Sequence, residues 1–202
     1  IAPPAGVTDR VLANNIAAES LNTEIHSVPT VHLGPNDSVA VKAYAATAGA
    51  TASLTSFTPK PQRAPTVIGF SSVGPSRASA GDLLKPDITA PGVDVVAAVP
   101  PIANPTGSFY DLKGGTSMAA PHIAGLAALL RQEFPTWSPN AVKSALMTTA
   151  GQADNQGRPI ARAGAGNATP FDMGAGHVRP GSAFDPGLVY DSGPLEWLQW
   201  AC

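Results

Sequence analysis

Cysteine, charge and long apolar runs are all scarce in this chain of 202 residues. The single cysteine is the last residue, Cys202, so no disulfide can close within the chain and no cysteine cluster can hold zinc. Charged residues make up 13%, the formal net charge is -2, and lysine and arginine are scattered singly, unlike the basic surface of a nucleic-acid-binding protein. No apolar run reaches the roughly 18 residues of a membrane span. We therefore expect neither nucleic acid nor a membrane among the partners.

Hydrophobic residues are plentiful, at 44%, and they are sufficient for a packed core. The length fits one ordinary domain, or the tail of one and most of another. The first residues, I-A-P-P, lack the charged and apolar regions of a signal peptide. A chain taken from within a longer protein would also lack an export signal, so its compartment does not follow from these residues.

The most informative segment spans residues 114–130 and reads G-G-T-S-M-A-A-P-H-I-A-G-L-A-A-L-L. Two glycines and a threonine permit a tight turn, and Ser117 then stands where a helix has unpaired N–H groups that favour negative charge. The pattern predicts a helix from Ser117 to about Gln132, buried because no polar face is wide enough to meet water. Taken alone, a helix N-cap is a better explanation of Ser117 than a nucleophile is, because serine is favoured at that position whatever the function.

Further elements are expected on both sides of this helix. Ser138 and Pro139 predict the start of an amphipathic helix that ends at Gly151. A short helix over Val39–Tyr44 is expected to turn Val39 and Tyr44 inward. Apolar patterns predict strands at Val28–Leu33, Ala50–Thr55, Thr66–Phe70 and, as a nearly continuous buried strand, Val93–Val99.

Several motifs occur in one order within residues 70–180: F-S-S-V-G-P, K-P-D-I-T-A-P-G, the serine segment, P-T-W-S-P-N-A-V-K-S-A-L-M-T-T-A and F-D-M-G-A-G-H-V-R-P. In content and order they resemble the subtilisin-like serine proteases, the subtilases, and in particular the plant-type members. The resemblance implies an α/β fold, the C-terminal portion of a subtilisin-like parallel-sheet sandwich. It also implies a serine-type endopeptidase that works through an acyl-enzyme, on polypeptide substrates, in an extracellular setting.

The same resemblance assigns roles to four neighbouring residues. Ser117 is the implied nucleophile, and its backbone N–H is one oxyanion donor. Gly115, Thr116 and Met118 are expected to border the substrate cleft. In the family order the aspartate and histidine precede the serine, and no segment of these 202 residues matches their motifs or that of the oxyanion asparagine. We therefore expect a chain that is inactive alone and needs the missing N-terminal half of the catalytic domain as its partner.

The domain organisation follows from the resemblance and from proline content. The string I-H-S-V-P-T-V-H-L is similar to the end of the β-rich protease-associated domain that large subtilases insert before the serine, so residues 1–57 are expected to be the C-terminal part of that domain. Residues 58–65 contain three prolines and are expected to be a linker. Residues 66–202 then form the C-terminal part of the catalytic domain.

Two other side chains, His122 and Asp87, are of types that can act as a catalytic base or bind a metal ion. His122 follows Ser117 by five residues, which turns it about 140° around the helix and moves it about 7.5 Å along it. We therefore expect a structural hydrogen bond from inside the fold and not a catalytic base. Asp87 is a single carboxylate, far short of a calcium site, so we expect no metal and no cofactor. Lys85 is expected to supply positive charge beside it. The alternative function is a non-catalytic binding module that uses exposed apolar surface.

Overall fold

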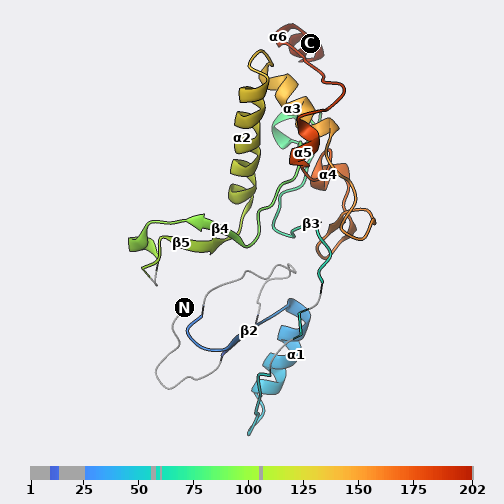
Figure 1. Ribbon diagram of the computed structural model, residues 1–202. Coiled ribbons are helices and arrows are strands. Elements are labelled where there is room, and N and C mark those ends of the chain that lie inside the picture. Colours follow the sequence, from blue (N-terminus) through green and yellow to red (C-terminus); the bar gives the residue numbers. More distant parts are fainter. Residues whose placement is uncertain (1–9, 14–25, 56–57, 60, 105–106, 202) are drawn as a thin grey trace. The chain divides into compact units, whose positions relative to one another are not determined.

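The computed structural model describes residues 10–13, 26–55, 58–59, 61–104 and 107–201 (Figure 1). They form a mixture of helices and short strands. The strands are β1 (Arg10–Ala13), β2 (Thr30–Leu33), β3 (Thr66–Val67), β4 (Val95–Ala98), β5 (Tyr110–Lys113), β6 (Ala161–Arg162) and β7 (Gly166–Asn167). The α-helices are α1 (Pro35–Ala45), α2 (Thr116–Glu133), α3 (Pro139–Thr148), α4 (Pro170–Met173), α5 (Pro180–Ala183) and α6 (Pro194–Ala201), and two 3₁₀ turns are η1 (Arg77–Ser79) and η2 (Pro101–Ala103).

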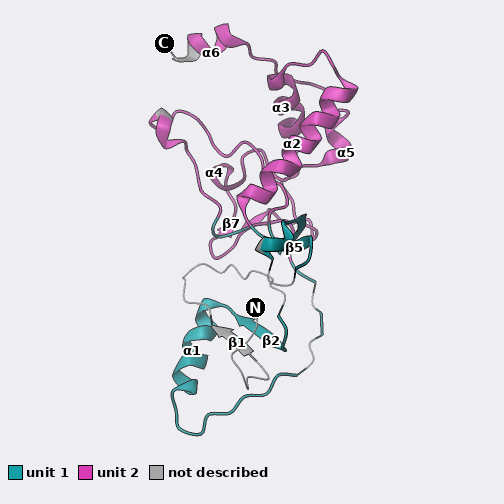
Figure 2. Ribbon diagram, turned by 90° about the vertical axis from the view of Figure 1, so that its left-hand side faces the viewer, with its two compact units in different colours: residues 1–62, 68–70, 93–114 teal, residues 63–67, 71–92, 115–202 magenta. Residues whose placement is uncertain are grey.

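The chain divides into two compact units (Figure 2). The first comprises residues 1–62, 68–70 and 93–114, and the second comprises residues 63–67, 71–92 and 115–202. In the first unit β1 and β2 pair in parallel, and α1 follows β2 directly. β4 and β5 of the same unit form an antiparallel pair.

Helix α1 confirms the predicted helix but not its orientation. Pro35 stands at the start of the helix, where its missing N–H has no cost. Val39 is 71% exposed and Tyr44 is 52% exposed, so the expectation that they turn inward was wrong. The strand expected over Ala50–Thr55 is also absent, because those residues have no regular secondary structure.

Strand β4 lies within the predicted strand Val93–Val99, but it is not buried on both faces. Its residues alternate between half-buried and exposed, and Val96 is 68% exposed. The reason is its antiparallel pairing with β5, since an antiparallel ribbon can leave one face to water.

The main core of the second unit lies between α2, α3 and α5. Leu130 of α2 packs against Val142 and Leu146 of α3 in this core. Helix α3 begins as predicted, with the Ser138 hydroxyl accepting the N–H of Ala141 at 3.0 Å. These contacts fix α2 along one side.

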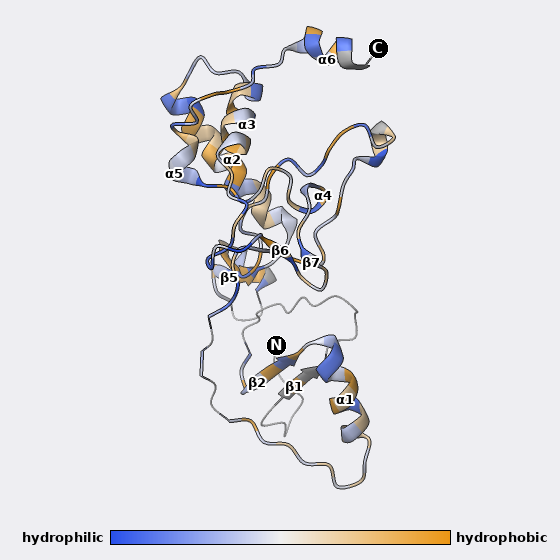
Figure 3. Cartoon of the chain, turned by 90° about the vertical axis from the view of Figure 1, so that its right-hand side faces the viewer, coloured by the Kyte–Doolittle hydropathy of each residue, from blue (hydrophilic) through white to orange (hydrophobic). Residues whose placement is uncertain are grey.

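The opposite side of α2 is exposed in the described part of this unit. Ala120, Ala124 and Ala128 face solvent there, although most of the helix between its polar ends is apolar (Figure 3). The expectation of a fully buried helix was therefore wrong for this chain. A helix that is apolar all round is covered only where other elements pack on every side, and here α3 and α5 pack on one.

A second, smaller core lies under the three-stranded sheet β3-β6-β7. β3 pairs in parallel with β6, and β6 pairs antiparallel with β7. Arg63, just before β3, donates from Nε to a buried Asp154 carboxylate oxygen at 2.5 Å and ties the start of the unit to the loop before β6. The parallel pair β3–β6, whose strands are separated in the sequence by α2 and α3, is consistent with the predicted α/β class.

Candidate active site

Two glycines set the direction in which α2 begins. Gly115 is the N-cap, with φ 155° and ψ 158°, a conformation that residues with a Cβ rarely adopt. Its N–H donates to the carbonyl of Gly92 at 2.7 Å, and its carbonyl accepts the N–H of Met118 at 3.0 Å. A Cβ atom on Gly92 would lie 2.8 Å from the Gly115 carbonyl oxygen and 3.2 Å from the Ala119 Cβ. The start of α2 is thus held against the A-P-G segment by close backbone contact.

Ser117 is the second residue of α2, and it is exposed. The first N–H groups of a helix have no partner inside it, and the helix dipole places partial positive charge there. Thr116 is also exposed, while Gly115 and Met118 are half-buried. The Ser117 hydroxyl in this position can approach the carbonyl carbon of a substrate that comes from solvent. The N–H groups of the first helical turn then lie near the oxyanion that develops.

His122 makes the structural hydrogen bond that its spacing predicts. Its Nδ1 lies 2.8 Å from the carbonyl oxygen of Met118, one turn earlier in α2. Because a carbonyl only accepts, Nδ1 carries the proton and donates. The side chain is exposed and not inside the fold, so the partner was found on the helix itself.

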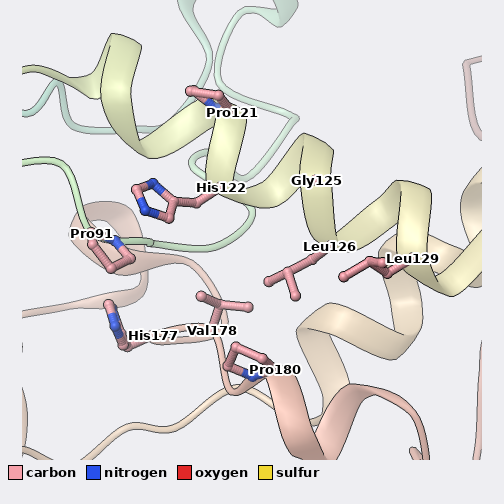
Figure 4. A pocket seen from close by; sticks show the side chains of 9 residues that line it. All are labelled: Pro91, Pro121, His122, Gly125, Leu126, Leu129, His177, Val178 and Pro180. Atoms are coloured by element: carbon pink, nitrogen blue, oxygen red, sulfur yellow. The ribbon is translucent and has the colours of Figure 1, made fainter. Parts of the chain in front are cut away.

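An apolar groove of about 420 Å³ runs beside this stretch of α2 (Figure 4). His122, Leu126 and Leu129 line it from the helix, and His177, Val178 and Pro180 line it from the facing segment. Burial lowers the pKa of His177, which favours its neutral form. The backbone of His177 exchanges hydrogen bonds of 2.7 and 2.8 Å with Gly151 in an antiparallel bridge. These two bonds hold the backbone of this histidine in place.

Asp87 binds two lysines. Its carboxylate lies 2.6 Å from the Nζ of Lys85 and 2.8 Å from the Nζ of Lys143. Burial acts to raise the pKa of Asp87, but the hydrogen bonds from Lys143 and Lys85 lower it overall. The expected positive charge from Lys85 is present. Lys143 could not be predicted, because it lies on α3, far from Asp87 in the sequence.

Among the described residues there is no group of three or more His, Cys, Asp or Glu side chains placed to bind a metal ion.

Comparison with known proteins identifies the family. The profile of the subtilase family matches residues 12–176. The chain belongs to the subtilase family. Subtilases are serine-type peptidases, which agrees with the site segment at the start of α2.

The relatives include plant subtilisin-like proteases. The chain is 43% identical to subtilisin-like protease SBT1.3 of Arabidopsis thaliana over 98% of this chain and 27% of that protein. It is 49% identical to subtilisin-like protease SBT3 of Solanum lycopersicum over 69% of this chain and 19% of that protein. A solved structure, fervidolysin from Fervidobacterium pennivorans, a keratinolytic enzyme related to subtilisin, matches 51% of this chain and 15% of its own, with 27% identity and a TM-score of 0.35.

This subtilase chain thus spans about a quarter of the length of the full-length relatives that it matches from end to end. Within its described residues, no helix is both long enough and apolar enough to cross a bilayer. The roles of Ser117 as nucleophile and of Gly115, Thr116 and Met118 as cleft residues stay predictions. The structure places these four in one continuous segment with the serine exposed to solvent.

Proposed function

We propose that the chain is the serine-bearing part of a subtilisin-like serine endopeptidase and that Ser117 is its nucleophile. The observation that carries this proposal is an exposed hydroxyl on the second residue of a long apolar helix. Two features of the backbone support it. Gly115, the N-cap, has φ 155°, and its N–H donates to the Gly92 carbonyl, so the start of the helix that carries Ser117 is held in place.

In the proposed reaction the Ser117 Oγ forms a bond to the scissile carbonyl carbon while a histidine takes the hydroxyl proton. The tetrahedral oxyanion rests against the Ser117 N–H and a second donor, and such a donor is typically worth about 10²- to 10³-fold in rate. The C–N bond then breaks as the histidine returns the proton to the leaving amine. Water hydrolyses the acyl-enzyme and restores the serine.

The base and the second donor in this proposal come from polypeptide outside these residues. His122 donates its Nδ1 proton to its own helix and is turned away from Ser117 by the helical spacing. Since the chain spans about a quarter of its full-length relatives, we expect it to be inactive alone and to require the N-terminal half of the catalytic domain. Met118, Thr116 and Gly115 would border the cleft for a polypeptide substrate.

We also propose the division into residues 1–57 as the end of a protease-associated domain, 58–65 as a linker and 66–202 as the C-terminal part of the catalytic domain. The proline content of residues 58–65 supports the linker. An extracellular location is proposed from the family alone.

A non-catalytic binding module is the second candidate. The exposed apolar side of α2, with Leu129 and Ala124 facing solvent, favours it because a surface of this kind can bind another polypeptide. In this alternative Ser117 would be an exposed helix residue without special reactivity.

An active-site fluorophosphonate probe distinguishes the two. It is applied to the 202-residue chain and to a longer protein that contains the upstream region, each with Ser117→Ala and Ser182→Ala variants. Ser182 is a matched control because it is also an exposed serine in the first turn of a helix.

We expect labelling of the longer protein only, lost in Ser117→Ala and kept in Ser182→Ala. An unlabelled longer protein, or labelling that survives Ser117→Ala, would overturn the protease assignment. Strong labelling of the short chain would disprove its inactivity while leaving Ser117 in place as the nucleophile.

A further inference from the structure

Two imidazoles of the first unit meet end to end. The Nε2 atoms of His26 and His32 lie 2.9 Å apart, and the ring centroids lie 5.1 Å apart with the planes tilted by 45°. Nothing in the proposed protease mechanism uses either residue. The pair stands apart from the serine segment in the sequence, and both side chains are partly buried.

Local structure brings the two rings together. His32 is the third residue of β2, where it pairs with Leu12 of β1. The chain bends at Ser27 and Val28, and the Thr30 hydroxyl donates to the Val28 carbonyl at 2.9 Å. Without that bend, residues six apart in an extended chain would be separated by about 20 Å. The strand fixes one ring, and the bend returns the other to it.

The present contact is a hydrogen bond between two imidazoles, in which one Nε2 donates and the other accepts. Only one proton can lie between the two nitrogens. When both rings carry their proton on Nδ1 instead, two Nε2 lone pairs face the same point. Imidazole nitrogen is the commonest metal ligand among protein side chains.

The spacing suits a single metal ion. With metal–nitrogen bonds of about 2.0 to 2.1 Å, two nitrogens lie about 2.9 Å apart at a right angle and about 3.4 Å apart at the tetrahedral angle. The ring centroids would then be about 5 Å apart in the tetrahedral case, and here they are already at 5.1 Å. A small pivot of the rings about fixed centroids opens the gap and directs both lone pairs at the ion.

We propose that His26 and His32 form a two-histidine site for a divalent ion that prefers nitrogen ligands, with Zn²⁺ as the representative. The described residues place no third His, Cys, Asp or Glu with the pair, so these two imidazoles are the protein ligands that the described residues supply. Such a site selects late first-row ions over Ca²⁺ and Mg²⁺, which prefer oxygen. Binding joins the segment before β2 to the strand itself and stabilises the first unit.

The test is equilibrium dialysis of the 202-residue chain against ZnCl₂ at about pH 7.5, where imidazoles are mostly neutral, with CaCl₂ in parallel. The variants are His26→Gln and His32→Gln, because a glutamine amide can keep a hydrogen bond to the remaining ring but is a poor zinc ligand. His122→Gln is the matched control, since that histidine is exposed and lies in the second unit. Carbethoxylation of histidines, mapped by peptide mass spectrometry with and without Zn²⁺, locates the site independently.

We expect one equivalent of Zn²⁺ and no Ca²⁺, with affinity at least about tenfold weaker in each of His26→Gln and His32→Gln and unchanged in His122→Gln. Zn²⁺ should protect His26 and His32 from modification and leave His122 reactive. Unchanged affinity in either glutamine variant, loss of binding in His122→Gln, or no protection at positions 26 and 32 would overturn the proposal. None of these results bears on Ser117.

Discussion

The contact between Gly92 and Gly115 permits a test in which two identical substitutions have opposite effects. In Gly92→Ala the new Cβ would stand 2.8 Å from the Gly115 carbonyl oxygen and 3.2 Å from the Ala119 Cβ, closer than ordinary contact. In Gly125→Ala, within α2, the new Cβ has no atom within 4 Å apart from its chain neighbours and the backbone of its own helix. Both changes add one methyl group, so any difference between them comes from the space around each position.

The expected magnitudes follow from packing and helix propensity. Overpacking typically costs about 1 to 3 kcal/mol, and replacing an unstrained helix glycine by alanine gains about 0.5 to 1 kcal/mol. For a chain of this size each kcal/mol shifts Tm by about 2 to 4 °C. Gly92→Ala should therefore lower Tm by about 2 to 12 °C, and Gly125→Ala should raise it by about 1 to 4 °C. Thermal unfolding followed by far-ultraviolet circular dichroism measures both.

The same pair tests whether the contact positions the serine. To reach ordinary contact, the Gly115 carbonyl must move by roughly half an ångström from the new Cβ, and displacements of about 1 Å at a reacting group cost about 100-fold in rate. In the longer protein, fluorophosphonate labelling should slow by about tenfold in Gly92→Ala and stay unchanged in Gly125→Ala. Wild-type Tm and labelling rate in Gly92→Ala, or a Tm loss in Gly125→Ala, would refute the reasoning.

Two further predictions concern buried and paired carboxylates. Replacing either Lys85 or Lys143 by methionine should cost at most about 1 kcal/mol in urea unfolding, whereas the double variant should cost more than the sum because Asp87 loses both partners; additive losses would show that the lysines act independently. Burial acts to raise the pKa of Asp154, but N–H groups and the Arg63 guanidinium lower it to about 2. Since that folded-state pKa is below the unfolded value, the carboxylate stabilises the fold above about pH 4 and loses this effect as the pH falls towards about 2. The difference in unfolding free energy between wild type and Asp154→Asn should shrink over that interval, and a constant difference would contradict the assignment.

The sequence predicts the elements whose signals are local. α2 was predicted from its nearly continuous apolar run after two glycines, and α3 from apolar residues at helical spacing after the start signals Ser138 and Pro139. Neither signal depends on tertiary structure. His122 was correctly assigned a structural hydrogen bond, since helical spacing alone turns it away from Ser117. The pairing of Lys85 with Asp87 needed only a separation of two residues.

Burial and long-range partners could not be predicted in the same way. Val39 and Tyr44 carry an inward-facing pattern, yet they are exposed, because a pattern states which face could be covered and not whether a neighbour covers it. Residues 50–55 alternate like a strand but have no strand partner in the described part of the chain. Lys143 reaches Asp87 only because the segment after Asp87, with Ile88 and Ala90, packs against the core that α3 helps to form.

The exposed side of α2 connects stability with the proposed chemistry. The middle of the helix is apolar all round, but α3 and α5 pack on one side, and the other side carries exposed residues such as Ala124 and Ala128. The proposed protease needs a base and an oxyanion donor from the N-terminal half of its domain, and we propose that the same half covers the exposed apolar face of the serine helix. If one segment supplies the catalytic groups and also covers α2, then α2 becomes buried in the same step in which Ser117 gains its base and its second oxyanion donor. The longer protein should then gain resistance of α2 to amide hydrogen exchange together with fluorophosphonate reactivity, and a protein with protected α2 but unreactive Ser117 would separate the two.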